Sequence, residues 1–171
     1  RHDDLSYDAL DRLIAISQVR SATYETEFAH DTLSNVTAVT DAAGRSTDLL
    51  HDDRGNLVET VSPDTGRTRF LYDAAGILTQ KIENAPATGV GGRVTTYAYD
   101  AVGRVTSVTS PTGPTTTEYD AVGQVTKTIR PSGAQSLSAY DARGLLTSTT
   151  NPLGHVTSYG YDNAGQQTGM T

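Results

Sequence analysis

The chain has 171 residues, 36% of them hydrophobic, and a formal net charge of −7 at pH 7. The acidic balance disfavours nonspecific binding to nucleic acid, and no apolar run approaches transmembrane length, so we expect no nucleic-acid partner and no membrane insertion. The absence of Cys excludes disulfides, a thiol nucleophile and a thiolate zinc site. Because the chain starts with Arg1 rather than Met, we interpret it as a piece of something longer.

The N-terminal stretch allows two interpretations. Leu10, Leu13 and Ile14 have a spacing that suits a short amphipathic helix. The segment from Tyr7 to Leu13 also has the layout of later repeats, with Asp11 where those repeats have Gly. We favour a degenerate first repeat and keep the helix as the alternative.

A phrase of an aromatic residue, Asp, two variable residues and Gly recurs along the chain. Its copies start at 7, 30, 51, 72, 99, 119, 140 and 161, with spacings of 20 to 27 residues, most often 21. In the second and third copies His30 and His51 replace Tyr. The sequence therefore predicts a single array of eight repeats over residues 1–171, with an enlarged Gly/Pro-rich loop at 84–92.

Each repeat carries two turn signals. In the first, Asp accepts hydrogen bonds from backbone N–H groups that follow it, and Gly takes the left-handed conformation that closes the turn. The structural turn residues predicted in this way are Asp73, Gly76, Asp100, Gly103, Asp120, Gly123, Asp141, Gly144, Asp162 and Gly165. The second signal is Pro followed by Gly two or three residues later, as in Pro131 and Gly133.

The runs between turn signals have strand length, so one repeat is predicted to be a pair of antiparallel strands. The fold class is then all-β: a repeat meander of about 14–16 short antiparallel strands. Open twisted sheets rarely exceed about ten strands, so we expect a curled, spiralling sheet. A four-bladed propeller with two repeats per blade is the rival, which the shorter period disfavours. Open sheet edges also predict edge-to-edge self-association.

Alternation along the strands predicts which side chains share a face. Tyr97 and Tyr99, which precede a turn, should lie on one face. After a turn, Leu57 and Val61 should share a face, and Glu59 between them is polar.

The phrase Tyr-Asp-x-x-Gly-Arg-Val-Thr, present from Tyr99 to Thr106, is followed by a Pro-x-Gly turn and a Thr/Tyr-rich strand that leads to the next Tyr-Asp. This combination resembles the Rhs/YD-repeat family, which includes bacterial Rhs-type polymorphic toxin shells and is related to toxin-complex and teneurin YD shells. The resemblance covers almost the whole chain and implies a β-sheet that spirals into a hollow shell.

The resemblance also implies a function. Bacterial members are secreted or surface-exposed proteins whose shells enclose a C-terminal toxin, and animal relatives are cell-surface adhesion proteins. This chain would be a structural segment of a shell that encloses or presents a toxin or effector domain outside the chain. Its partners would be the remaining repeats and that domain, and its localisation secreted or cell surface. The family's self-cleavage module carries an Asp-Pro-type motif, which is absent here, so autoproteolysis is expected elsewhere.

The sequence offers no constellation for catalysis. No nucleophile-elbow motif and no phosphate-binding loop of the Walker or dinucleotide type is present, so we predict no catalytic residue, no cofactor and no enzyme activity. The repeated Asp residues suit turn capping better than cation binding. His30 and His51 lie one repeat apart, roughly 10 Å in a sheet, which is awkward for a shared metal, so we predict no metal site.

The Tyr positions carry the alternative function. Four of them, in two repeats, are paired on one face, which suits stacking against sugars on a concave wall. A carbohydrate-binding or adhesion module would use Tyr97, Tyr99, Tyr159 and Tyr161. Packing of these rings within the wall is the simpler interpretation.

Overall fold

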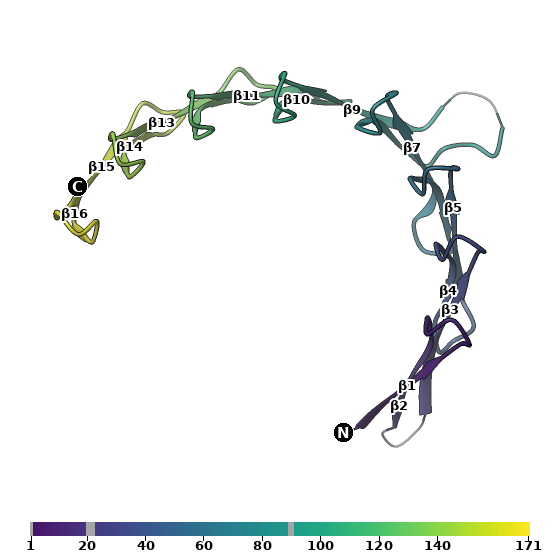
Figure 1. Cartoon of the computed structure of the whole chain (residues 1–171). Coiled ribbons are helices and arrows are strands. Elements are labelled where there is room, and N and C mark those ends of the chain that lie inside the picture. Colours follow the sequence, from purple (N-terminus) through teal and green to yellow (C-terminus); the bar gives the residue numbers. More distant parts are fainter. Residues whose placement is uncertain (1, 20–22, 89–90) are drawn as a thin grey trace. The chain divides into compact units, whose positions relative to one another are not determined.

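The computed structural model describes residues 2–19, 23–88 and 91–171, and every regular element in these ranges is a β-strand. The chain forms two compact units, residues 1–94 and 95–171, and the division falls within β9. In each unit the strands follow one another as a meander joined by short turns (Figure 1). The described residues contain no helix long and apolar enough to cross a membrane.

The first unit begins with eight strands, each antiparallel to its neighbour in sequence. They are β1 (His2–Tyr7), β2 (Leu13–Val19), β3 (Thr23–His30), β4 (Val36–Thr40), β5 (Ser46–His51), β6 (Leu57–Ser62), β7 (Gly66–Tyr72) and β8 (Leu78–Glu83). The first repeat is a strand pair, so the alternative of an N-terminal helix is wrong. The reason is local, because the chain reverses at Asp8, whose carboxylate accepts hydrogen bonds from the backbone N–H groups of Leu10 and Arg12.

The remaining strands continue the same pattern through the second unit. They are β9 (Arg93–Tyr99), β10 (Val105–Ser110), β11 (Gly113–Tyr119), β12 (Val125–Ile129), β13 (Gln135–Tyr140), β14 (Leu146–Thr150), β15 (Val156–Tyr161) and β16 (Gln167–Met170). Sixteen antiparallel strands in sequence order confirm the predicted fold class. The curl of the sheet stays a prediction.

The propeller alternative is wrong. Blades of four strands would break the hydrogen-bond ladder after every second repeat. Instead β4 pairs with β5 in the first unit and β12 pairs with β13 in the second. The first of these pairings joins the second repeat to the third, where two blades would have to separate.

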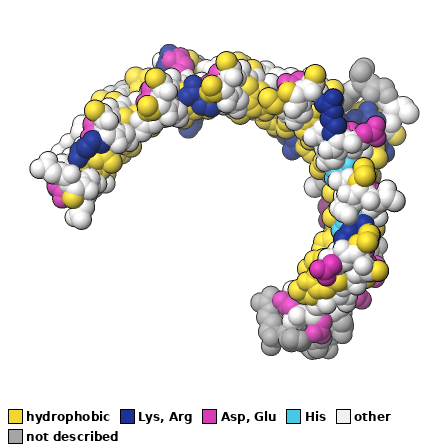
Figure 2. Space-filling view, in the orientation of Figure 1, with side chains coloured by type: hydrophobic (Ala, Val, Ile, Leu, Met, Phe, Trp, Pro, Cys, Tyr) yellow, Lys and Arg dark blue, Asp and Glu magenta, His cyan; other side chains and the backbone are white. Residues whose placement is uncertain are grey.

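The sheet within each unit is a single layer. Among the described residues only Ala15, Thr68 and Ala85 are buried, and no side chain is less than 2% exposed. Hydrophobic, acidic and basic side chains are all visible at the surface of both units (Figure 2). The fold is therefore held by ladder hydrogen bonds and by contacts between neighbouring strands, as the lean hydrophobic composition suggested.

A β-bulge follows each turn of the repeat and changes the faces that simple alternation predicts. Leu57 pairs with His51, but Glu59 pairs with Leu50, so Val58 is an extra residue on the second strand. Val61 then pairs with Asp48 and lies on the face opposite Leu57. The prediction that Leu57 and Val61 share a face is wrong, because one added residue reverses the alternation beyond it.

The segment 84–92 lies between the end of β8 and the start of β9, and its residues 89 and 90 are outside the described ranges. Its first part is attached to β7. The Ala85 N–H donates to the Arg67 carbonyl at 3.0 Å, and the Arg69 guanidinium donates to the Ala87 carbonyl at 3.0 Å. Ala85 is only 7% exposed as a result.

Candidate functional site

One hydrogen-bond pattern is shared by the eight turns that begin with the repeat's Asp. In the turn at Asp120, the carboxylate Oδ1 accepts from the Val122 N–H at 3.0 Å and from the Gln124 N–H at 2.8 Å. The Gly123 N–H donates to the Asp120 carbonyl at 3.2 Å, and the Asp120 N–H donates to the Gln124 carbonyl at 2.9 Å. The same capping bonds occur at Asp8, Asp31, Asp52, Asp73, Asp100, Asp141 and Asp162.

The fourth residue of each turn takes a positive φ. The five Gly residues predicted for this place have φ between +79° and +94°, and they are Gly76, Gly103, Gly123, Gly144 and Gly165. In the degenerate repeats Asp11 and Ser34 take the place of Gly with φ of 60° and 69°. Left-handed backbone is costly for residues with a Cβ, so these two turns carry strain that the Gly turns avoid.

Two capped turns lie at the opposite ends of the strands. The sequence analysis missed the turn at Asp41, and it predicted the turn at Pro152 and Gly154 without its Asn151 cap. Asp41 Oδ1 accepts from the Ala43 and Arg45 N–H groups, both at 2.9 Å. Asn151 Oδ1 accepts from the Leu153 and His155 N–H groups at 2.9 and 3.0 Å. The sequence did contain the signal for the turn at Asp41. Gly44 follows Asp41 by three residues, the same spacing as between Asp and Gly in the repeat phrase.

The turn carboxylates are surrounded by hydrogen-bond donors. The Arg12 side chain and backbone N–H hold the pKa of Asp8 at about 2, well below the usual range of an Asp carboxyl. The side-chain amides of Asn35 and Asn56 lower the pKa values of Asp31 and Asp52 in the same way. Within the described ranges no group of His, Cys, Asp or Glu is arranged to hold a metal ion. The carboxylates therefore serve the turns themselves.

In three repeats the opening Tyr contacts the preceding repeat. Its hydroxyl donates to the carbonyl of the first strand residue after the previous turn. The bonds run from Tyr72 to Leu57 at 2.9 Å, from Tyr119 to Val105 at 2.8 Å and from Tyr140 to Val125 at 3.1 Å. Burial raises the pKa of Tyr72, with a smaller contribution from the charge of Asp52 in the preceding turn.

The two His residues at Tyr positions do not continue this ladder. His30 pairs with Val36 and His51 pairs with Leu57, as Tyr72 pairs with Leu78. The Nδ1 atoms of both imidazoles are buried and have no hydrogen-bond partner among the described residues. An imidazole is shorter than a phenol and cannot place a donor where the Tyr hydroxyl lies.

A second set of bonds links five of the turns to the turn that follows. A long polar side chain two or four residues after the Asp donates to a backbone carbonyl in the following turn. These bonds join Arg12 to Asp31, Arg54 to Ala74, Arg104 to Asp120, Gln124 to Gly144 and Arg143 to Asp162. The Arg104 guanidinium also lies 4.7 Å from the centre of the Tyr119 ring, a cation–π contact. We call the Tyr bonds and the turn bonds together the repeat ladder.

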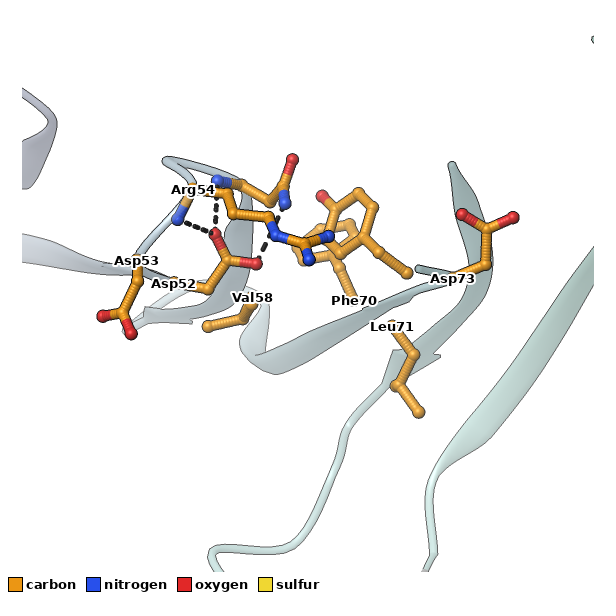
Figure 3. Close-up of a pocket in the computed structure, with 9 residues that line it drawn as sticks. Asp52, Asp53, Arg54, Val58, Phe70, Leu71 and Asp73 are labelled. Atoms are coloured by element: carbon orange, nitrogen blue, oxygen red, sulfur yellow. Dashed lines mark hydrogen bonds between the residues drawn. The ribbon is translucent and has the colours of Figure 1, made fainter. Parts of the chain in front are cut away.

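An open groove of about 450 Å³ lies between the turns that begin at Asp52 and Asp73. Val58 and Phe70 contribute apolar lining, and Arg54 and three acidic residues, Asp52, Asp53 and Asp73, contribute charge (Figure 3). The dashed lines in Figure 3 show that the Asp52 carboxylate is bonded within its own turn. The groove thus contains no residue pair of the kind that activates a nucleophile.

The four Tyr residues proposed for sugar stacking are partly exposed. Tyr97 and Tyr99 pair with Val108 and Val105 on β10. Tyr159 and Tyr161 pair with Met170 and Gln167 on β16. The two Tyr residues of each pair are separated by one strand residue, so their rings share a face.

These features define a class of protein: a repeat protein made of two-stranded β units, each tied to the next through its turns and tyrosines. The sequence profile of the family described as RHS Repeat matches residues 7–47, 51–85, 87–115, 99–135 and 140–171. The chain therefore belongs to the RHS repeat family, which confirms the resemblance seen in the sequence. No curated protein matches the chain by sequence.

Solved structures of Tc toxin proteins have a similar fold. TcdB2-TccC3 without its hypervariable C-terminal region matches with a TM-score of 0.77 at 17% identity, covering 96% of this chain and 11% of that chain. TcdB2-TccC3 matches at 0.60 and 18% identity, with 98% and 12% covered. A Photorhabdus luminescens Tc holotoxin pore matches at 0.59 and 19% identity, with 96% and 11% covered. The chain spans about a tenth of the length of each of these proteins, and the similarity to them is a similarity of fold.

Proposed function

We propose that the chain is a wall segment of an Rhs-type shell, with no catalysis of its own, and that its eight repeats form a single array. The observation that carries this proposal is the repeat ladder on a single-layer sheet. Its hydrogen bonds run from repeat to repeat, so they stiffen a thin wall that has no core beneath it. The Tyr, Arg and Gln side chains of the ladder bond to neighbouring repeats, which suits a structural role in a wall.

The proposed shell encloses or presents a toxin or effector domain that lies outside this chain. Support comes from the matched structures, which are TcdB2-TccC3 proteins with a C-terminal region described as hypervariable, and a Tc holotoxin pore. By the same likeness, the protein acts outside the cell that makes it, secreted or at the cell surface. Its partners are the other repeats of the wall and the enclosed domain.

Protection of the enclosed domain from protease tests the proposal. The longer protein that contains this chain is digested with a nonspecific protease, beside the isolated downstream domain. We expect the domain to be cleaved much more slowly within the longer protein. Equal rates of cleavage would overturn the proposal.

A matched pair of variants connects that protection to this wall segment. Gly123→Val forces a β-branched residue to a φ of +94°, which disrupts one turn. Val122→Ala, in the same turn, shortens a side chain that is 81% exposed and serves as the control. We expect faster cleavage of the downstream domain with Gly123→Val and an unchanged rate with Val122→Ala.

Carbohydrate binding is the second candidate, carried by the two partly exposed Tyr pairs. A glycan array probed with the chain, followed by titration with Tyr fluorescence, tests it. Binding that is lost in Tyr97→Ala and Tyr159→Ala, and kept in Thr112→Ala at a hairpin tip, would support it. An array without bound glycans would eliminate it.

A further inference from the structure

One junction between repeats lacks both kinds of bond that make up the repeat ladder. It is the junction between the second and third repeats, where β4 pairs with β5. The Tyr bond is absent because His51 takes the place of the Tyr, and its Nδ1 atom is buried without a partner among the described residues. The turn bond is absent because Leu33 cannot donate, and the Asn35 amide donates instead to Asp31 in its own turn, at 2.9 Å.

The turn of the third repeat shows what is missing. In both turns an Asn four residues after the Asp donates to the Asp carboxylate at 2.9 Å. The turns differ two residues after the Asp, where the third repeat has Arg54 and the second has Leu33. The Arg54 guanidinium donates to the Ala74 carbonyl of the following turn at 2.8 Å. On the other side Arg12 donates to the Asp31 carbonyl at 2.7 Å, so the junctions before and after this one each keep a turn bond.

The other end of the same strand pair is closed. There β4 and β5 are joined by the turn at 41–45, in which the Asp41 N–H donates to the Arg45 carbonyl at 3.0 Å. The Arg45 guanidinium donates to the Asp41 carboxylate at 2.8 Å and to the carboxylate of Asp64, in the next turn on that side, at 3.0 Å. The strand pair is therefore held at one end and has no ladder bond at the other.

We propose that β4 and β5 form a hinge in the sheet of the first unit. The two strands separate from the end beside the turns at Asp31 and Asp52, while the turn at 41–45 holds them together. Local opening of a fold begins where the fewest interactions have to break, and this end of the junction has lost two. The proposal goes beyond the role of a wall, since it concerns how the sheet moves and not what the sheet encloses.

Hydrogen exchange, measured by mass spectrometry on the longer protein that contains this chain, tests the proposal. The strands β12 and β13 are the reference, because they pair over as many residues as β4 and β5 and their junction has both ladder bonds. Each missing hydrogen bond favours opening about five-fold. After correction for intrinsic rates, we expect the amides of β4 and β5 to exchange about 25-fold faster than those of β12 and β13.

The exchange is measured at pH 8 because a charge on His51 would act across the open end. The pKa of Asp31 is lowered mainly by the Asn35 side chain and to a smaller extent by the charge of His51. A protonated imidazole would therefore attract the carboxylate of the preceding turn. Imidazoles are mostly neutral at pH 8, so the missing hydrogen bonds are measured without this attraction.

Leu33→Arg gives the second turn the residue that the third turn has. Leu33 is 67% exposed, and an Arg there would donate to the Asp53 carbonyl, as Arg54 does to that of Ala74. We expect the exchange of β4 and β5 to slow about five-fold. Adding His51→Tyr should bring it to the rate of β12 and β13.

Val122→Arg is the matched control. It places the same side chain at the same exposed position of a turn that already has its turn bond, from Gln124, so the exchange of β12 and β13 should not change. The proposal is overturned if β4 and β5 exchange no faster than β12 and β13, or if Leu33→Arg fails to slow their exchange. Neither result bears on the protease test of the wall, which concerns the enclosed domain.

Discussion

Replacing His51 by Tyr is expected to stabilise the first unit. In the structure the His51 Nδ1 atom is buried without a partner. A Tyr at this place would direct its hydroxyl to the Val36 carbonyl, as Tyr72 does to Leu57 at 2.9 Å. A new hydrogen bond contributes about 1 kcal/mol, and relief of an unsatisfied buried polar atom about 1–3 kcal/mol. After the cost of ordering a larger side chain, we expect a gain of about 1–2 kcal/mol in the free energy of unfolding.

Urea unfolding followed by far-UV circular dichroism measures this gain. With a slope of about 2 kcal/mol per molar urea, the midpoint of the first unit should rise by roughly 0.5–1 M. His51→Phe separates the two contributions, because it removes the unsatisfied nitrogen and adds no hydroxyl. Tyr72→Phe is the reverse test and should cost about 1 kcal/mol. The reasoning is refuted if His51→Tyr is no more stable than His51→Phe.

Three further expectations concern the turns. Ser34→Gly should stabilise the chain by about 1 kcal/mol and Gly123→Ser should destabilise it similarly, since both positions have positive φ; equal midpoints in urea would contradict this. Asp120→Ala should cost about 1 kcal/mol through two lost capping bonds, whereas Asp120→Asn should be nearly neutral because Asn151 caps a turn in the same way. The pKa of Asp8 is lowered to about 2, so its contribution to stability is complete above pH 3.8 and is lost as the pH falls toward 2; Asp8→Asn should flatten the acid limb of a stability–pH curve.

The turns were predictable because their chemistry is local. Asp120 and Gly123 occupy their roles through bonds within five residues, and the same logic would have found Asp41. The number and direction of strands followed from turn spacing alone. Strand length and turn chemistry thus determine the fold class without any long-range information.

The faces and the repeat ladder were not predictable in the same way. Alternation fails at Val58 because the bulge depends on how two strands pair, which the single strand does not reveal. The bonds of Tyr72 to Leu57 and of Gln124 to Gly144 join residues from successive repeats, so they require the register of both. The recurrence of the Tyr positions was recognised from the sequence, but the backbone carbonyls that their hydroxyls contact were not.

Because the sheet has no second layer, the number of repeats can change in evolution with little effect on the rest of the fold. Within the described residues, contacts between strands join neighbours in sequence, so the stability of the fold resembles that of a one-dimensional chain of links. A whole repeat can be gained or lost without redesigning a shared core, and a weak link, such as one with His in place of Tyr, lowers cooperativity locally. The enlarged 84–92 segment shows the same tolerance at smaller scale: added residues leave the strands on both sides intact. In the proposed shell, the size of the enclosed space can thus evolve one repeat at a time.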